Sequence, residues 1–361
     1  MPFPIGPAAG SKEPESNFSI QDSLGLRCAV TPVFAIDLQD GTLRAPGHGG
    51  RHGLGTSFYV TPFGHQLSAM HVITDYLNEA EVIISPGSIT DRIGQADTVI
   101  AILHDPGLCY GARPAGDILR AVNFAIFPVD QSKHPLAMTF TRSQLKNIEP
   151  SLDLASWRIH GLSDRKAVYL PLRVGCGASV KNGDRVMAVG YPKITSWRRP
   201  AAEMVTFQEE MRGSIGQVIE VKDKWDQENK IWPTLTVDVQ WASGMSGGPV
   251  LNENGEVVGI VSRGADCHGD SPAWSSALWL EQLPFQSDIF GRIDPRFPGW
   301  VCGWGVCNPS SLIELFETRE AAEAFAQRHG AGLTVAQVST PYRTQFRNPS
   351  APDDRRARPR S

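Results

Sequence analysis

Short apolar runs separated by turn signals fill most of this 361-residue chain, and they limit the folds that it can adopt. The runs are rich in Val, Ile, Phe and Tyr, which favour strands. They are GTSFYVTP (55–62), AVNFAIFPV (121–129), DRVMAVGYP (184–192), TLTVDVQW (234–241) and EVVGIVS (256–262). Asn-Gly pairs at 182–183 and 254–255 lie between runs and suit the positive φ of tight hairpins. The pattern predicts an all-β sandwich or barrel.

The run from Thr234 to Trp241 alternates strictly between polar and apolar residues. Successive side chains of a strand point to opposite faces. The alternation therefore predicts one strand with a single buried face.

Charge and hydropathy exclude several classes of protein. With 34 Lys and Arg against 38 Asp and Glu, the net charge of −4 argues against a nucleic-acid binder, which needs a basic surface. No apolar stretch approaches the length of a membrane helix, so no membrane contact is expected. The N-terminus lacks the basic and apolar regions of a signal peptide, and the six cysteines are spread thinly. We expect free thiols and a cytoplasmic protein.

Composition divides the chain into successive parts. The ends are rich in Pro and polar residues, which predicts a flexible segment at the N-terminus and a disordered tail at the C-terminus. The parts are the flexible segment 1–24, the strand-rich region 25–285, a C-terminal extension 286–345 and the tail 346–361.

The C-terminal extension begins with a Pro/Gly/Trp-rich connector, residues 286–310. Residues 311–329 predict a helix packed on the outside of the β unit. Ser311 and Glu314 suggest a capping box, and Gly330 supplies a C-terminal stop.

The strongest chemical signal is the segment GMSGGPV at 244–250. Glycines around Ser246 permit a tight turn that exposes its Oγ and lets the N–H groups of Gly244 and Ser246 point to one spot. Acyl transfer needs such a nucleophile beside two donors that stabilise an oxyanion. The letters also satisfy the G-x-S-x-G pattern of α/β-hydrolase esterases, but strand, turn and strand follow Ser246 rather than a helix.

A serine nucleophile needs a base, and His71 is the candidate. It directly follows the predicted hairpin GTSFYVTPFGHQ, within the segment LSAMHVI. A buried strand can hold the ring rigidly while the ring reaches a cleft.

Two segments resemble the chymotrypsin-fold (trypsin-like) serine peptidases of bacterial type: GTSFYVTPFGHQLSAMHVI and GMSGGPVLNENGEVVGIVSRGADC. LPLRVGCGASVKNGDRVMAVGYP resembles the first strands of that family's second barrel. His71 precedes Ser246, as in the family order His, Asp, Ser. The resemblance covers about residues 25–285. It implies two six-stranded antiparallel β-barrels, about 25–160 and 161–285, followed by the helical extension.

Two segments compete for the family's acid position. Asp153 begins a D-[LIV]-A stretch of the family type and lies 93 residues before Ser246, the spacing of the family template. It lies 82 residues after His71, against roughly 45 in the template, which requires an insertion. Asn123 begins a segment of the same shape but carries an amide, which in that place lowers kcat about 10⁴-fold. We favour Asp153; Asn123 in that position would make a weak or inactive peptidase.

The resemblance implies a serine endopeptidase that hydrolyses protein or peptide substrates through His71, Asp153 and Ser246 and an acyl-enzyme, with Gly244 and Ser246 holding the oxyanion. It implies no cofactor or metal. A second interpretation is a catalytically weak or inactive peptidase-like binding or scaffold module, and an esterase is a third. Nothing in the sequence indicates an oligomeric state.

In the family, Gln240 would lie at the base of the primary specificity pocket, while Ser262 and Gly264 would line it. A neutral base disfavours selection for Lys or Arg. Met245 replaces the aspartate with which many secreted members pair a new N-terminus, and Val72 replaces a disulfide cysteine. We therefore expect neither that activation switch nor that disulfide.

Overall fold

The computed structural model describes most of the chain. The described residues are 6–7, 10–20, 25–37, 43–44, 53–73, 98–103, 119–122, 152–159, 167–199, 204–223, 232–265, 272–330 and 332–341. Most of the run expected at 121–129, the alternative acid Asn123 and the expected tail 346–361 lie outside this part of the chain.

The N-terminal part of the strand-rich region forms one antiparallel sheet with the order β7-β6-β2-β4-β5-β8, and β3 pairs with β2. Its strands are β2 (Val30–Asp37), β3 (Leu43–Arg44), β4 (Gly53–Tyr59), β5 (His65–Ser68), β6 (Thr98–Leu103), β7 (Leu119–Ala121) and β8 (Ala155–Arg158). The short helix α1 (Leu26–Ala29) leads into β2. Over the described residues this sheet is open, with β7 and β8 at its edges.

The second sheet closes into an antiparallel barrel of six strands, because β9 pairs with both β12 and β10. Its strands are β9 (Arg185–Arg199), β10 (Met204–Lys222), β11 (Thr234–Val237), β12 (Pro249–Leu251), β13 (Val257–Ala265) and β14 (Trp274–Trp279). The expected Asn-Gly turns precede β9 and join β12 to β13, and Gly183 and Gly255 have φ values of 90° and 78°. The all-β, double-barrel class expected from the sequence is confirmed, with one closed barrel and one half-barrel sheet over the described residues.

The expected strand at 234–241 is shorter than its alternation predicts, since β11 ends at Val237. At the next residue, Asp238 bonds to Gln217 of β10 through its side chain as well as its main chain: its Oδ1 accepts from the Gln217 N–H at 2.7 Å, and its own N–H donates to Gln217 O at 3.1 Å. Trp241 is nevertheless buried as expected, and its main-chain N–H donates to Ser275 Oγ at 2.8 Å.

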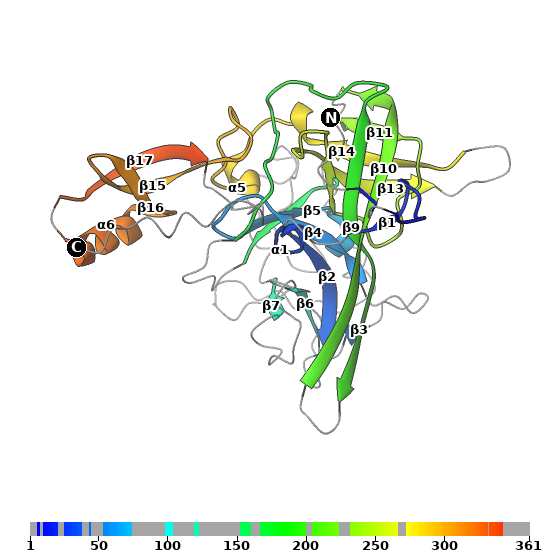
Figure 1. The fold of residues 1–361 in the computed structure, drawn as a ribbon, viewed down its shortest axis with the longest axis horizontal. Helices are drawn as coiled ribbons and strands as arrows, with labels where there is room; N and C mark the ends of the chain where they lie inside the picture. The colour runs from blue at the N-terminus through cyan, green and yellow to red at the C-terminus, as the bar shows by residue number, and fades with distance from the viewer. Residues whose placement is uncertain are drawn as a thin grey trace, which may run out of the picture.

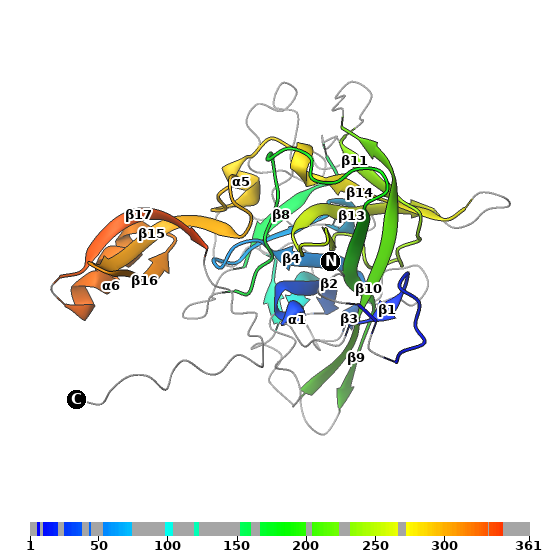
Figure 2. The ribbon, with the colours of Figure 1, turned by 45° about the horizontal axis from the view of Figure 1, so that its top comes forward.

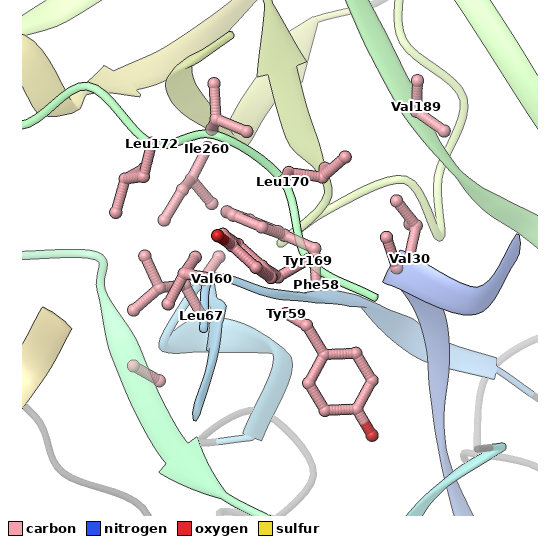
Figure 3. Packing of buried hydrophobic residues seen from close by; sticks show 14 of the residues in the cluster. Val30, Phe58, Tyr59, Val60, Leu67, Tyr169, Leu170, Leu172, Val189 and Ile260 are labelled. Carbon is pink, nitrogen blue, oxygen red and sulfur yellow. The ribbon is translucent and has the colours of Figure 1, made fainter. Parts of the chain in front are cut away.

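One apolar core continues across both sheets (Figure 3). Phe58 of β4, Val189 of β9 and Ile260 of β13 all belong to it. The connecting segment 167–174 lies between the sheets, and the Leu170 N–H donates to Tyr59 O at 2.9 Å. Burial of these side chains therefore fixes the two sheets against each other.

The expectation of a flexible segment over 1–24 is wrong for its described residues from 10 to 20. Phe18 and Ser19 form β1, which pairs with β10, and the Phe18 side chain is fully buried. Phe18 covers Gly213, where any Cβ would meet the phenyl ring at 2.5 Å. The free energy gained by burying the Phe18 ring therefore orders this segment although the residues around it are rich in proline.

The C-terminal extension differs from the single helix that was expected. The segment 311–316 is a strand, and the helix begins only at Arg319. Thr318 caps that helix, because its hydroxyl accepts from the Ala321 N–H at 3.3 Å, whereas Ser311 bonds to Asn308. The expected stop at Gly330 is confirmed, with φ of 114°.

Part of the expected connector, 286–310, is the central strand of a small antiparallel sheet with the order β16-β15-β17. Figures 1 and 2 show this sheet and its helix set to one side of the two larger sheets, with a short helix between them. The elements are the 3-10 helix η2 (Leu280–Gln282), α5 (Ser287–Phe290), β15 (Trp300–Asn308), β16 (Ser311–Phe316), α6 (Arg319–His329) and β17 (Thr334–Pro341).

None of the helices in the described part of the chain is long and apolar enough to cross a membrane.

Candidate active site

The fold brings His71 and Asp153 together although 82 residues separate them along the chain. His71 follows the end of β5 by three residues, and Asp153 precedes β8 by two. Because β5 and β8 are paired with Ser68 opposite Ala155, both side chains lie at the same end of this strand pair. His71 Nδ1 is 2.9 Å from Asp153 Oδ2, and the main-chain N–H of His71 donates to Asp153 Oδ1 at 3.0 Å.

The surroundings of Asp153 keep its carboxyl ionised. The residue is 5% exposed, and burial raises its pKa. The hydrogen bonds and charge of His71 and the hydroxyl of Ser262 outweigh that effect, so the pKa lies below its ordinary value of 3.8. Ser262 Oγ donates to Oδ2. An ionised carboxylate only accepts hydrogen bonds, which places a proton on His71 Nδ1 and leaves Nε2 as the basic nitrogen of the neutral ring.

Ser246 lies on the turn before β12, and both sheets hold this turn. Its carbonyl oxygen accepts from the Thr56 N–H of β4 at 2.8 Å. The next residue, Gly247, donates its N–H to Val261 O of β13 at 2.8 Å. The side chains of Ser246 and His71 are both partly exposed, so solvent or a substrate reaches them.

Gly247 brings the serine turn close to the segment that carries His71. Its φ is +82°, and a Cβ there would overlap Ser68 Oγ and lie 2.9 Å from Ala69 N. Ser68 and Ala69 stand three and two residues before His71. Only glycine fits this position, because both the conformation and the space exclude a side chain.

The peptide groups around Ser246 leave two donors free. Gly244 has φ of +94°, and the Met245 N–H turns back to Ala242 O at 3.0 Å. Within the described part of the chain, no acceptor bonds to the N–H of Gly244 or of Ser246. No hydrogen bond joins the Ser246 hydroxyl to the His71 ring over the same residues. Such bonds are often loose in the absence of substrate.

The three expected pocket residues are not equivalent in the structure. Ser262 is buried and bonds to Asp153, which makes it a support of the acid. Gln240 and Gly264 are exposed. The role of these residues in specificity stays a prediction.

Two contacts of the site were not expected from the sequence. One is the bond from Ser262 to Asp153, and the other is the contact of Thr56 with the serine turn. Thr56 stands in the run GTSF that carried the resemblance, but its partners in the serine turn, Gly244 and Ser246, lie at least 188 residues away along the chain. Only the packing of the two sheets reveals them.

Comparison with known proteins fits this geometry. The trypsin-like peptidase domain matches residues 55–260, a segment that contains His71, Asp153 and Ser246. This segment is more than half of the chain, so the chain belongs to the trypsin-like peptidase family.

A probable periplasmic serine endoprotease, DegP-like, from Pseudomonas putida is 25% identical over 198 residues, which are 55% of this chain and 35% of that protein. The chain thus spans about a third of this relative's length. The inactive mutant form of Rv3671c from M. tuberculosis matches at a TM-score of 0.35 and 17% identity, over 78% of this chain and 92% of that one. The active form of that protease matches at a TM-score of 0.35 and 16% identity, over 74% of this chain and 82% of that one.

The α/β-hydrolase alternative is wrong for this chain. The named strands on either side of Ser246 pair antiparallel, and Ser246 leads into β12 rather than into a helix. A nucleophile elbow needs a parallel sheet and a following helix.

Proposed function

We propose that this protein is a serine endopeptidase in which Ser246 is the nucleophile, His71 the base and Asp153 the residue that orients the base. The contact between the Asp153 carboxylate and His71 Nδ1, at 2.9 Å, carries this proposal. The serine turn, held against Thr56 and Ser68, supports it. The family to which the chain belongs supports peptide hydrolysis as the reaction.

In the proposed mechanism, Ser246 Oγ attacks the carbonyl carbon of a peptide bond while His71 Nε2 takes the hydroxyl proton. The free N–H groups of Gly244 and Ser246 stabilise the oxyanion. The C–N bond breaks, the leaving amine takes the proton from His71, and an acyl-enzyme remains. Water then attacks the ester, again giving a proton to His71, which returns it to Ser246. Asp153 stays ionised and stabilises the imidazolium throughout.

An unpaired strand edge supports an extended peptide as the substrate. β12 pairs with β13 only as far as Ile260, so β13 residues 263–265 pair with β14 alone in the described structure. This edge follows Val261, the residue that holds Gly247. Extended peptides bind such an edge by adding a strand.

A matched pair of serine variants tests the proposal. Ser246→Ala should abolish hydrolysis of a fluorogenic peptide panel and labelling by a fluorophosphonate, since both require an activated hydroxyl. Ser243→Ala, at an exposed serine in the same turn, should retain both. Equal hydrolysis by Ser246→Ala and wild type would refute the assignment. A folded wild type that neither hydrolyses peptides nor takes the label would favour the binding module instead.

We also propose a reducing, cytoplasmic location. Four of the six cysteines are described, and all four (Cys28, Cys176, Cys302 and Cys307) are free thiols. Alkylation of protein from its native cells, without reductant, should modify all six cysteines. A disulfide found by mass spectrometry would contradict the proposal.

A further inference from the structure

Thr56 is fully buried where the two sheets meet, and it holds the serine turn at two points. Its N–H donates to Ser246 O at 2.8 Å. Its Oγ1 donates to Gly244 O at 2.9 Å. A residue of the N-terminal sheet therefore bonds to both residues whose N–H groups face the proposed oxyanion.

The direction of the hydroxyl bond follows from its second partner. Thr56 Oγ1 also lies 3.0 Å from the Tyr191 nitrogen of β9, and an amide N–H can only donate. The single proton of the hydroxyl therefore points to Gly244 O. One hydroxyl thus joins β9 to the serine turn, two parts of the second barrel.

The space around this hydroxyl is closed. A Cβ on Gly190 would lie 2.9 Å from Thr56 Oγ1 and 2.7 Å from the Met245 Cα. Absence of a side chain at Gly190 lets the hydroxyl and the serine turn approach β9 together. Because Thr56 is fully buried, an unpaired donor or acceptor at its hydroxyl would be costly.

Thr56 also connects to the segment before His71. Its carbonyl oxygen accepts from Ser68 Oγ at 2.7 Å. Its register partner on β2 is Pro32, which has no N–H to donate. Thr56 thus links the serine turn to the end of β5, three residues before the proposed base.

We propose that Thr56 is a positioning residue, whose hydroxyl fixes the peptide groups around Gly244 so that the N–H groups of Gly244 and Ser246 face the oxyanion. The inference rests on the proposed function. Gly244 has the conformational freedom of a glycine at positive φ, so its orientation depends on such anchoring. Donors that are aligned before the reaction stabilise the transition state, and loss of alignment by about 1 Å can cost up to about 100-fold in rate.

The test compares Thr56→Val, which keeps the shape and removes the hydroxyl, with Thr56→Ser, which keeps the hydroxyl. Thr56→Val should lower kcat about 10-fold or more with KM little changed, because alignment acts mainly on the transition state. Thr56→Ser should restore most of kcat. Thr56→Ala removes the same hydroxyl with less bulk against Gly190, and it is measured in the same way should the valine variant not fold.

Thr31→Val is the matched control. Thr31 is a second fully buried threonine of the N-terminal sheet, and its hydroxyl bonds to Ser57 and Gln66 rather than to the serine turn. It should lower the melting temperature and leave kcat unchanged. Equal falls in kcat for both valine variants, or an unchanged kcat in folded Thr56→Val, would overturn the inference and leave the proposed function intact. A folded wild type without hydrolysis or labelling would overturn both.

Discussion

The two carboxylate oxygens of Asp153 accept from the ring and from the main chain of His71, so this residue controls both the tautomer and the orientation of the base. Asp153→Asn keeps the shape but offers only one acceptor, and its NH₂ group favours the wrong tautomer. We expect kcat to fall about 10⁴-fold with KM little changed. Steady-state hydrolysis of a peptide substrate measures both constants.

Asp288→Asn serves as the control, because Asp288 is exposed on α5. It should retain the wild-type kcat. A fall in kcat of less than tenfold in Asp153→Asn would contradict Asp153 as the orienting acid and would make Asn123 the candidate for that position.

The lowered pKa of Asp153 also links folding to pH. A carboxyl whose pKa is lower in the folded state contributes stability that is present above its unfolded value, here 3.8, and lost as pH falls through the folded value. The melting temperatures of wild type and Asp153→Asn should therefore differ most at neutral pH and converge below about pH 4. Thermal melts between pH 7 and pH 3 measure this difference. A gap that widens as pH falls would contradict the assigned direction.

The sequence indicates His71 and Ser246 because each lies in a local pattern of strand, turn and glycines. Asp153 has a weaker local pattern and needed the spacing to Ser246 as a second argument. The sequence does not reveal the part played by Thr56, because its bonds depend on how β4 meets β9 and the serine turn. Contacts between distant segments leave no periodic signal in either one.

At the level of elements, the strands beside the Asn-Gly turns were predicted well, the alternating run 234–241 only over its first four residues, and the C-terminal helix less well. Apolar residues at 312, 313, 315 and 316 fit a helical face as well as a strand, so periodicity alone does not decide between them. Pairing with β15 makes this segment a strand. Whether this segment forms a strand or a helix therefore depends on its contact with β15, which the local pattern of apolar residues does not contain.

The corrected boundary makes Thr318 the cap of α6. Thr318→Ala should lower the free energy of unfolding by about 1 kcal/mol, because the Ala321 N–H loses its acceptor. Urea denaturation monitored by circular dichroism measures the change. Ser311→Ala, at the position first expected to cap the helix, should cost less. A larger loss for Ser311→Ala than for Thr318→Ala would contradict the boundary.

For the whole molecule, the C-terminal extension contacts the strand pair that positions the proposed base and acid. Arg158 at the end of β8 forms an ion pair with Glu317, which lies between β16 and α6. After α5, a Cβ on Gly291 would meet the His65 ring of β5 at 2.7 Å, so the backbone packs directly on that strand. β5 leads to His71 and β8 begins just after Asp153, which makes the extension a support for the strands behind the site.

A double-mutant cycle of Arg158→Met and Glu317→Gln measures how strongly this ion pair holds the extension. The Glu317 side chain is 16% exposed and that of Arg158 is 36%, so solvent screens the pair only in part. We expect a coupling energy of about 1–2 kcal/mol in thermal or urea unfolding, between the values typical of exposed and buried pairs.

The exposed pair Arg319–Glu323 on α6 is the matched control, with side chains 61% and 44% exposed. Its cycle should give about 0.3–0.5 kcal/mol, as for other pairs one helical turn apart. Both couplings should weaken in high salt, and that of Arg319–Glu323 more completely, because water reaches both of its partners. A coupling for Arg158–Glu317 no larger than the control would mean that packing at Gly291, rather than charge, holds the extension against β5 and β8.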